Sequence, residues 1–330
     1  MNYRRFGNTD LIVSEIGFGA WGIGGPSMAG NIPIGWGDVN DDISIAALNK
    51  AYQLGINFFD TADFYGLGHS EELIGKVFAN QKDVIIASKV GHKLNKDKSI
   101  ALDYSKAHIL FACDESLKRL KRDFIDYYQL HSARISHLEN GECIEAMEKL
   151  KEQGKIRYWG ISLNTFNPFP EAEYFIQNKI GDGFQLVLNI INQHALPLLR
   201  KANNEGLGII ARMPLQFGVL TGKFSPDIKF AKNDHRNFRL TKEIISAIKK
   251  ELHKISSEEV FNKVSQTTIS LSYILSYSQI STVIPGMKTP EQVVQNTKPI
   301  IKIDKNIQQK IEESYNQNLY KIVEMMEKLG

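Results

Sequence analysis

The sequence is poor in several features that would narrow its class at once. It contains only two cysteines, Cys113 and Cys143, which fall in separate helix-like segments and show no Cys-x-x-Cys spacing. A disulfide framework and a thiolate metal site are therefore not expected, and a reducing cytoplasm suits this composition. No apolar run approaches the roughly 20 residues of a membrane-spanning helix, and the N-terminus lacks the apolar stretch of a signal peptide. We expect a cytoplasmic protein with no membrane partner.

An excess of charge of either sign is also missing. The 330 residues include 40 basic and 37 acidic side chains, which gives a net charge of +3, and no basic cluster stands out. This balance gives no reason to expect a nucleic acid partner. Apolar residues make up 42% of the chain, enough for a large buried core. No linker or change of composition divides the sequence, so residues 1–330 are expected to form a single domain.

What the sequence does have is a repeated unit. Eight short apolar runs rich in Ile, Val, Phe and Tyr recur along the chain, and amphipathic segments of helical length separate most of them. Each run is too short for a buried helix and rich in β-favouring residues, so each predicts a core strand. The runs are Ile16–Ala20, Ile56–Phe59, Val84–Ala87, Ile125–Leu130, Ile156–Ile161, Phe184–Leu188, Leu207–Ala211 and Thr282–Ile284.

Strands that alternate with helices predict an α/β protein with parallel pairing. Eight such strands can close into a (β/α)8 TIM barrel that side chains fill, and an open doubly wound sheet is the alternative. Three predicted helices end in a glycine that is followed at once by a strand, at Gly55, Gly154 and Gly206, as left-handed C′ caps do.

Three segments fall outside this repeat. Residues 3–13 predict an N-terminal β-hairpin over the barrel floor. Residues 217–240 are polar and contain glycine, which predicts a mobile loop within the seventh unit. Residues 304–330 predict a C-terminal helical extension.

Polar residues stand at the ends of three neighbouring strands, where the active sites of such barrels lie. Asp60 comes just after the second run, Lys89 just after the third and His131 just after the fourth, and Tyr65 follows in the loop after Asp60. Any one of them alone would be a helix cap or a satisfied rim residue. The four together, on adjacent strands, predict an active site.

These four residue types suit reduction of a carbonyl group by hydride transfer. The alkoxide that forms must take up a proton, and a tyrosine with a pKa of about 10 can supply it while staying protonated at neutral pH. The ammonium of Lys89 would lower the pKa of Tyr65, and Asp60 would keep that ammonium charged. His131 would hydrogen-bond the carbonyl oxygen.

Six segments together resemble the aldo-keto reductase family. They are FDTADFYG with GHSEELIGK, IIASKVG, IDYYQLH, IRYWGIS, PLQFGVLTGK and IPGMKTPEQVVQN, and they occur in the family's order between about residue 3 and residue 300. The resemblance implies the (β/α)8 fold and NADP(H) as cofactor without a metal. It also implies a catalytic tetrad, whose roles fall on Asp60, Tyr65, Lys89 and His131.

The same resemblance implies a cofactor site after the fifth to eighth strands. Ser162 matches a nicotinamide-binding serine, but Leu163 stands where the family has asparagine, so either Asn164 reaches round or that contact is lost. Gln185 matches a second amide partner, and Arg212 replaces an aromatic residue that commonly stacks on the nicotinamide. The other implied positions are Pro214, Leu215, Gly218, Leu220 and Lys223 in a pyrophosphate clamp, Gly286, Lys288 and Gln292 around the adenosine 2′-phosphate, and Asn296 at the adenine.

Two of these cofactor positions bear on selectivity. The charge of Arg212 beside the ring should favour NADPH over the oxidised form, unless Arg212 is a rim salt-bridge residue. Lys288 is expected to contact the 2′-phosphate, with a solvated surface lysine as the alternative. Because Gln292 stands where some members have arginine, we expect only a moderate preference for NADPH.

Aromatic residues are expected to form the walls of the substrate pocket. The long first barrel loop carries Trp21 and Trp36, and Phe64 precedes the tyrosine of the tetrad. With His131 and Asn164 as nearby polar groups, the pocket suits a small polar carbonyl, such as a sugar derivative. A broad detoxifying reductase is the alternative.

Two functions of other classes also fit the residues in part. One is an NADPH-binding regulatory or sensor subunit of the same fold with slow turnover. The other is a barrel lyase that forms a Schiff base on Lys89. The remaining histidines show no spacing typical of a metal site.

Overall fold

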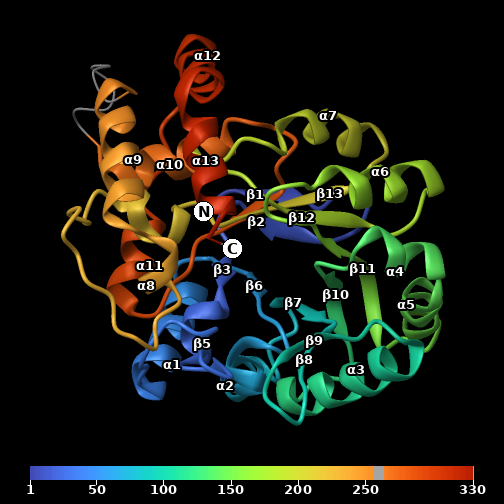
Figure 1. The fold of residues 1–330 in the computed structure, drawn as a ribbon. Coiled ribbons are helices and arrows are strands. Elements are labelled where there is room, and N and C mark those ends of the chain that lie inside the picture. Colours follow the sequence, from blue (N-terminus) through green and yellow to red (C-terminus); the bar gives the residue numbers. More distant parts are fainter. Residues whose placement is uncertain (256–263, 330) are drawn as a thin grey trace.

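The computed structural model describes residues 1–255 and 264–329, and its centre is a sheet of eight strands (Figure 1). All neighbours in this sheet pair in parallel, in the order β3-β6-β7-β10-β11-β12-β13-β14. Parallel bridges from Ile16 to Val283 and from Gly19 to Gly286 join β3 to β14 and close the barrel. The predicted (β/α)8 barrel is therefore confirmed, and the open doubly wound sheet is excluded.

The barrel strands lie close to the eight predicted runs, with shifted ends. Lys89 and His131 belong to their strands rather than following them, because the ladder between β7 and β10 continues to the barrel mouth. The barrel strands are β3 (Phe18–Gly19), β6 (Phe58–Asp60), β7 (Ile85–Val90), β10 (Ile125–His131), β11 (Ile156–Ser162), β12 (Gly183–Val187), β13 (Gly208–Arg212) and β14 (Thr282–Ile284).

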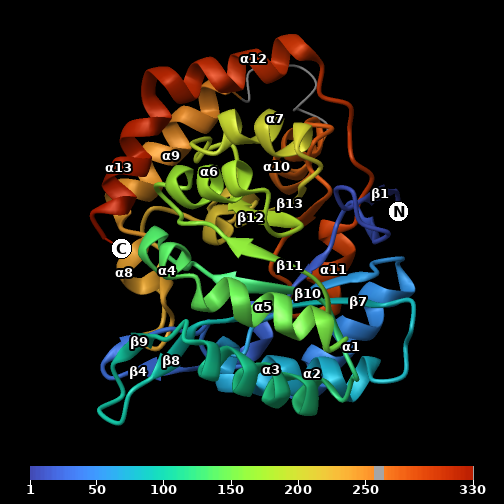
Figure 2. The same cartoon turned by 90° about the vertical axis from the view of Figure 1, so that its right-hand side faces the viewer.

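Helices surround the barrel, and their apolar faces are buried against the strands (Figures 1 and 2). The predicted left-handed caps are confirmed, since φ is 87° at Gly55, 69° at Gly154 and 72° at Gly206. The helices are α1 (Asp41–Gln53), α2 (His69–Phe78), α3 (Lys106–Leu120), α4 (Ile135–Asn140), α5 (Glu142–Glu152), α6 (Phe169–Asn178), α7 (Leu196–Asn204), α8 (Arg236–Arg239), α9 (Lys242–Ile255), α10 (Gln266–Leu275), α11 (Pro290–Asn296), α12 (Lys305–Ser314) and α13 (Tyr320–Glu327).

The floor of the barrel is covered by an antiparallel hairpin of β1 (Tyr3–Arg5) and β2 (Ile12–Ser14). The ring of Phe6, in the turn between them, is fully buried and lies 4.8 Å from the ring of Tyr127. It rests on the backbone of Gly208, where a Cβ atom would come within 2.6 Å of it. The predicted hairpin at the floor is therefore confirmed.

Two further hairpins lie on loops that follow barrel strands, and the sequence pattern did not predict them. They are β4 (Met28–Ala29) with β5 (Ile32–Pro33), after β3, and β8 (His92–Leu94) with β9 (Ile100–Leu102), after β7. Strands of two or three residues carry too little alternation to be recognised.

The segment 217–240 is partly helical and contacts the first barrel loop. It contains most of the 3-10 helix Gln216–Thr221 and the whole of α8, and Trp36 forms a bridge with Asp234. Its predicted mobility stays a prediction.

The C-terminal helical extension is confirmed. It consists of α12, a π-helical turn at Tyr315–Leu319, and α13, which pack beside α9 (Figures 1 and 2). Within the two described ranges, no helix is both long and apolar enough to cross a membrane.

Candidate active site

The structure brings together the four polar residues predicted at the barrel mouth. Nζ of Lys89 donates to Oδ1 of Asp60 over 2.6 Å, and it lies 3.3 Å from the hydroxyl of Tyr65. A third bond, of 2.8 Å, reaches the carbonyl of Thr61. The rings of Tyr65 and His131 meet edge to face with their centroids 5.9 Å apart.

Burial divides these four residues into two pairs. Lys89 and Asp60 are almost inaccessible, with exposed fractions of 0% and 2%. Tyr65 and His131 are partly exposed. A substrate at the mouth can thus reach the tyrosine and the histidine, while the ion pair beneath holds its geometry away from water.

The charges at the site follow from this burial. Burial alone would lower the pKa of Lys89, but the neighbouring Asp60 and Tyr65 outweigh it, so the pKa lies above its ordinary value and the ammonium stays charged. Burial raises the pKa of Tyr65, and Lys89 opposes that rise. The pKa of His131 is held well below its usual range by burial and then by its neighbours, chiefly His92 and Lys89. At neutral pH His131 is therefore uncharged and can still donate one hydrogen bond.

The loop that carries Tyr65 is fixed by buried contacts that sequence reasoning missed. Glu71 in the first turn of α2 is fully buried, accepts from Arg119 over 2.7 Å and accepts a 2.5 Å bond from Ser88, the neighbour of Lys89 in β7. Arg119 in turn packs against the backbone of Gly68 at the end of the loop. The only sequence signal was an acidic residue close to the tyrosine segment, and acidic residues are common at the start of any helix.

The second carboxylate oxygen of Asp60 connects the tetrad to the predicted cofactor side. Gln185 of β12 donates to it over 2.7 Å and Gln129 of β10 over 3.2 Å. Ser162, at the end of β11, lies 3.5 Å from the amide oxygen of Gln185. Gln129 was also missed, although a lone glutamine inside the apolar run IDYYQLH could have shown it.

Asn164 and Arg212 take positions that the sequence left open. The Asn164 side chain is exposed and accepts from the backbone N–H groups of Phe166 and Asn167, over 2.9 and 3.0 Å, so it forms a local turn. Arg212 donates to the Leu163 carbonyl over 3.0 Å, and its Nε is buried without a partner. Among the described residues no carboxylate pairs with Arg212, which excludes the rim salt bridge.

The predicted clamp lies in the loop after β13, where several residues have unusual backbone angles. The φ angles are 54° at Met213, 43° at Gln216 and 55° at Phe217, conformations that cost free energy in residues other than glycine and gather at functional sites. The positions from Pro214 to Lys223 all belong to this loop. Leu220 is buried, and Lys223 is exposed and donates to Gln295. The other predicted clamp positions, in the same loop, are Pro214, Leu215 and Gly218.

The residues predicted to bind the 2′-phosphate and the adenine lie just before α11 and along it. Nζ of Lys288 donates to the carbonyl of Trp36 over 3.2 Å, and its backbone N–H donates to Oε1 of Gln292 over 2.7 Å. Asn296 is buried, and the space beside Gly286 is open. Lys288 is therefore not the solvated surface lysine of the alternative, since it ties the first barrel loop to this helix.

The three predicted substrate residues also lie at the mouth. Trp21 stacks on Tyr65, with ring centroids 5.9 Å apart, and Trp36 meets Trp21 edge on at 5.5 Å. Phe64 lies 5.5 Å from the ring of His92.

Another histidine at the mouth, His235, stacks on Trp21, with ring centroids 4.5 Å apart. Neither His235 nor His92 was recognised in the sequence, although His92 follows Lys89 by only three positions. In the described part of the chain, no group of three or more His, Cys, Asp or Glu side chains could hold a metal ion.

Comparison with known proteins gives a consistent result. A model of the aldo/keto reductase family matches residues 15–316. The chain is 31% identical to an uncharacterized oxidoreductase of Bacillus subtilis, over 90% of each chain. It is 30% identical to L-galactose dehydrogenase of Arabidopsis thaliana, over 91% of this chain and 88% of that one. Among solved structures, the holo form of an aldo-keto reductase from Bacillus halodurans superimposes with a TM-score of 0.78 at 26% identity, over 95% and 96% of the two chains. The resemblance seen in the sequence is thus confirmed, and the chain belongs to the aldo/keto reductase family.

Proposed function

We propose that this oxidoreductase reduces an aldehyde or ketone to an alcohol with NADPH, and that Tyr65 supplies the proton. One observation carries the proposal. A charged, fully buried Lys89 lies 3.3 Å from the hydroxyl of Tyr65, and that tyrosine is itself partly exposed at the barrel mouth.

Each polar residue has a distinct part in this reaction. The carbonyl oxygen binds between the Tyr65 hydroxyl and the neutral His131, which orients it and stabilises the negative charge that develops there. Tyr65 donates its proton to that oxygen as the alkoxide forms. The Lys89 ammonium stabilises the phenolate left behind, and Asp60 holds the ammonium in place.

The residues beside the tetrad fit a nicotinamide dinucleotide. Bound NADPH would supply the hydride. Gln185 and Ser162 present buried polar side chains there, the Nε of Arg212 is buried without a partner, and the space beside Gly286 is open. An unpaired buried donor is costly, and a bound polar ligand would satisfy it.

The Asn164 side chain is hydrogen-bonded within its own turn. Ser162 and Gln185 would therefore hold the nicotinamide amide without a third side chain. The 2′-phosphate would be contacted by Lys288, which supports NADPH over NADH.

The two other functions are less well supported. A regulatory subunit with slow turnover does not need a complete tetrad with the tyrosine accessible, and single-turnover oxidation of bound NADPH would separate the two. A Schiff-base lyase needs a neutral lysine, but Lys89 donates three hydrogen bonds and is charged.

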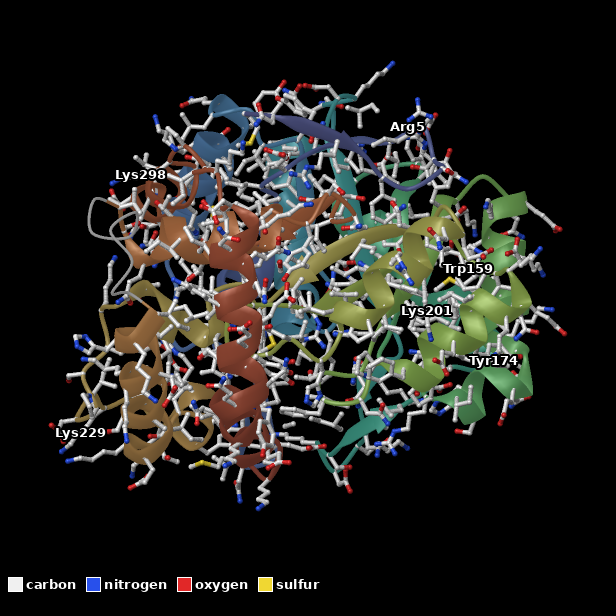
Figure 3. All side chains as sticks on the ribbon, turned by 90° about the horizontal axis from the view of Figure 1, so that it is seen from above. Arg5, Trp159, Tyr174, Lys201, Lys229 and Lys298 are labelled. Carbon is white, nitrogen blue, oxygen red and sulfur yellow. The ribbon has the colours of Figure 1, made fainter. Side chains whose placement is uncertain are left out.

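The experiment is a panel of aldehydes, ketones and sugars assayed by loss of NADPH absorbance. The Tyr65→Phe variant should lose about 10²–10⁴ in kcat, the usual contribution of a general acid. Binding of NADPH, followed by fluorescence, should stay unchanged. Tyr174→Phe is the matched control, because Tyr174 is a partly exposed tyrosine on α6 (Figure 3). A Tyr65→Phe protein that keeps more than a tenth of the turnover would overturn the assignment.

The substrate belongs to the proposal as well. We propose a small polar carbonyl, and similarity to L-galactose dehydrogenase supports a sugar-derived compound over a long alkyl aldehyde. The aromatic rings of Trp21, Trp36 and Phe64 would form the apolar walls around it. The alternative is a broad detoxifying reductase, which would accept matched alkyl aldehydes equally well.

A further inference from the structure

His92 lies beside the catalytic histidine and has no part in the proposed reaction. It begins β8, directly after Gly91, and its ring meets that of His131 edge to face with centroids 4.4 Å apart. The ring of Phe64 also lies near it, with centroids 5.5 Å apart. The rings of Tyr65, His131, His92 and Phe64 therefore form one continuous wall at the barrel mouth.

The His92 ring has hydrogen-bonding capacity that the protein does not use. Its Nδ1 is buried and has no hydrogen-bond partner among the described residues. Burial lowers the pKa of His92 to about 4, so the ring is neutral at pH 7, with one donor and one acceptor nitrogen. Unpaired buried polar atoms are rare in proteins. His92 as a whole is partly exposed, so a polar ligand at the barrel mouth can contact its ring.

The position of His92 in this row of rings determines which part of a bound substrate it can contact. In the proposed reaction the carbonyl oxygen is held between Tyr65 and His131, and the ring of His92 lies next to that of His131, with centroids 4.4 Å apart. A substrate whose carbonyl is held there extends its neighbouring carbon atoms past His131. An oxygen on one of these atoms is the group that comes within reach of His92.

We infer that His92 is a specificity-determining residue, which hydrogen-bonds a second oxygen on the carbon next to the reacting carbonyl. The preferred substrates are then small 2-hydroxyaldehydes and 1,2-dicarbonyl compounds. This inference rests on the proposed carbonyl reduction and narrows its substrate class. It also replaces the role expected of Asn164, whose side chain is turned into a local turn.

The test compares pairs of substrates that differ in the second oxygen alone. These pairs are glycolaldehyde with acetaldehyde and 2-hydroxypropanal with propanal, each measured as kcat/KM with NADPH. The wild-type protein should favour the oxygenated member of each pair. His92→Phe keeps an aromatic ring and removes both nitrogens, so it should lower kcat/KM about tenfold for the oxygenated member, the scale of one lost hydrogen bond with an unpaired buried group.

Two further variants separate hydrogen bonding from packing. His92→Gln retains a donor and an acceptor, and it should keep most of the preference that His92→Phe loses. His253→Phe makes the same substitution at an exposed histidine of α9 and should change neither member of a pair. If His92→Phe does not bind NADPH, His92→Leu takes its place.

Equal losses for both members of each pair would overturn the inference, because they would show that His92 only supports the fold of the site. An alkyl preference in the wild-type protein would overturn it as well. If the wild-type protein reduced neither series, the proposed function itself would fail, and that outcome is distinguishable from the other two.

Discussion

The side-chain amide of Gln185 donates a 2.7 Å hydrogen bond to Oδ2 of Asp60, while the other carboxylate oxygen of Asp60 accepts from Lys89 over 2.6 Å. One carboxylate thus joins Lys89 of β7 to the predicted nicotinamide side on β12. A buried carboxylate that pairs with a cation and accepts further hydrogen bonds has its desolvation offset on both oxygens.

Asp60→Asn should therefore destabilise the protein as well as inactivate it. Asparagine keeps the shape of the side chain but leaves the buried Lys89 ammonium without its counter-charge. Removing one partner of a buried pair costs about 3–5 kcal/mol, which chemical denaturation would measure. Glu173→Gln is the control, because Glu173 pairs with Lys201 at the surface, and surface pairs contribute little. Similar stability for the Asp60→Asn and wild-type proteins would contradict the buried-pair interpretation.

Stability should fall in mild acid because of the histidines at the mouth. Burial lowers the pKa of His235 to about 3, below the value of about 6.5 expected in the unfolded chain. Below pH 6.5 the unfolded state takes up a proton that the native state does not, so stability falls as the pH is lowered toward 3. Each such histidine contributes a slope of about 1.4 kcal/mol per pH unit.

His235→Phe should reduce this slope by the contribution of one histidine, as measured by urea unfolding at pH 7, 6 and 5. His253→Phe, at an exposed position, should leave the slope as it is. An identical pH dependence for the His235→Phe and wild-type proteins would show that His235 is not held neutral in the native state.

Lys288 should contribute to the preference for NADPH over NADH. A lysine–phosphate contact at a half-buried rim supports about a tenfold difference, so Lys288→Ala should weaken NADPH by that factor and NADH much less. Fluorescence titration with both cofactors measures the effect. Lys298→Ala is the control, since Lys298 is exposed beyond α11 (Figure 3). Equal weakening of both cofactors would show that Lys288 does not contact the 2′-phosphate and serves only to bind the carbonyls of Trp36 and Asp38.

Arg212 should favour the reduced cofactor. Its positive charge at the nicotinamide position repels the positively charged oxidised ring and not the neutral reduced ring. Arg212→Met removes the charge and keeps the length of the side chain, so it should bring the dissociation constants of NADPH and NADP⁺ closer together. An unchanged ratio of the two constants would place the Arg212 charge away from the ring.

The sequence allowed the barrel and the tetrad to be predicted because both depend on local patterns. A buried strand shows itself as an apolar run, and Asp60, Lys89 and His131 stand where three such runs end. What escaped prediction depends on contacts between distant segments. The link between Glu71 and Arg119 joins helices α2 and α3, and that between Gln185 and Asp60 joins two strands. In both cases the proximity appears only once the helices and strands are packed together.

The direction of individual side chains in loops also could not be predicted from the sequence. Asn164 is one position from the family's asparagine. Its side-chain oxygen, however, accepts from the backbone N–H groups of Phe166 and Asn167, and the side chain lies at the surface. Nothing in the sequence distinguished His92 from an ordinary loop residue. In the structure it begins the β8–β9 hairpin, and its ring lies against that of His131. Periodicity indicates which face of an element is buried, but it does not determine the direction of a single side chain in a loop.

The bridge that joins Ile16 to Val283 has a consequence for folding during synthesis on the ribosome. Ribosomes add about 5–20 residues per second, so the segment around Ile16 must wait on the order of tens of seconds for its partner. During that time the open edge of β3 is unpaired, and such edges are prone to aggregation. Contacts of such long sequence separation also slow folding, because loop closure must come before they stabilise anything. Because β3 pairs with β14 only at the end of synthesis, the nascent chain must be kept from aggregating with other chains until nearly all of the barrel has emerged.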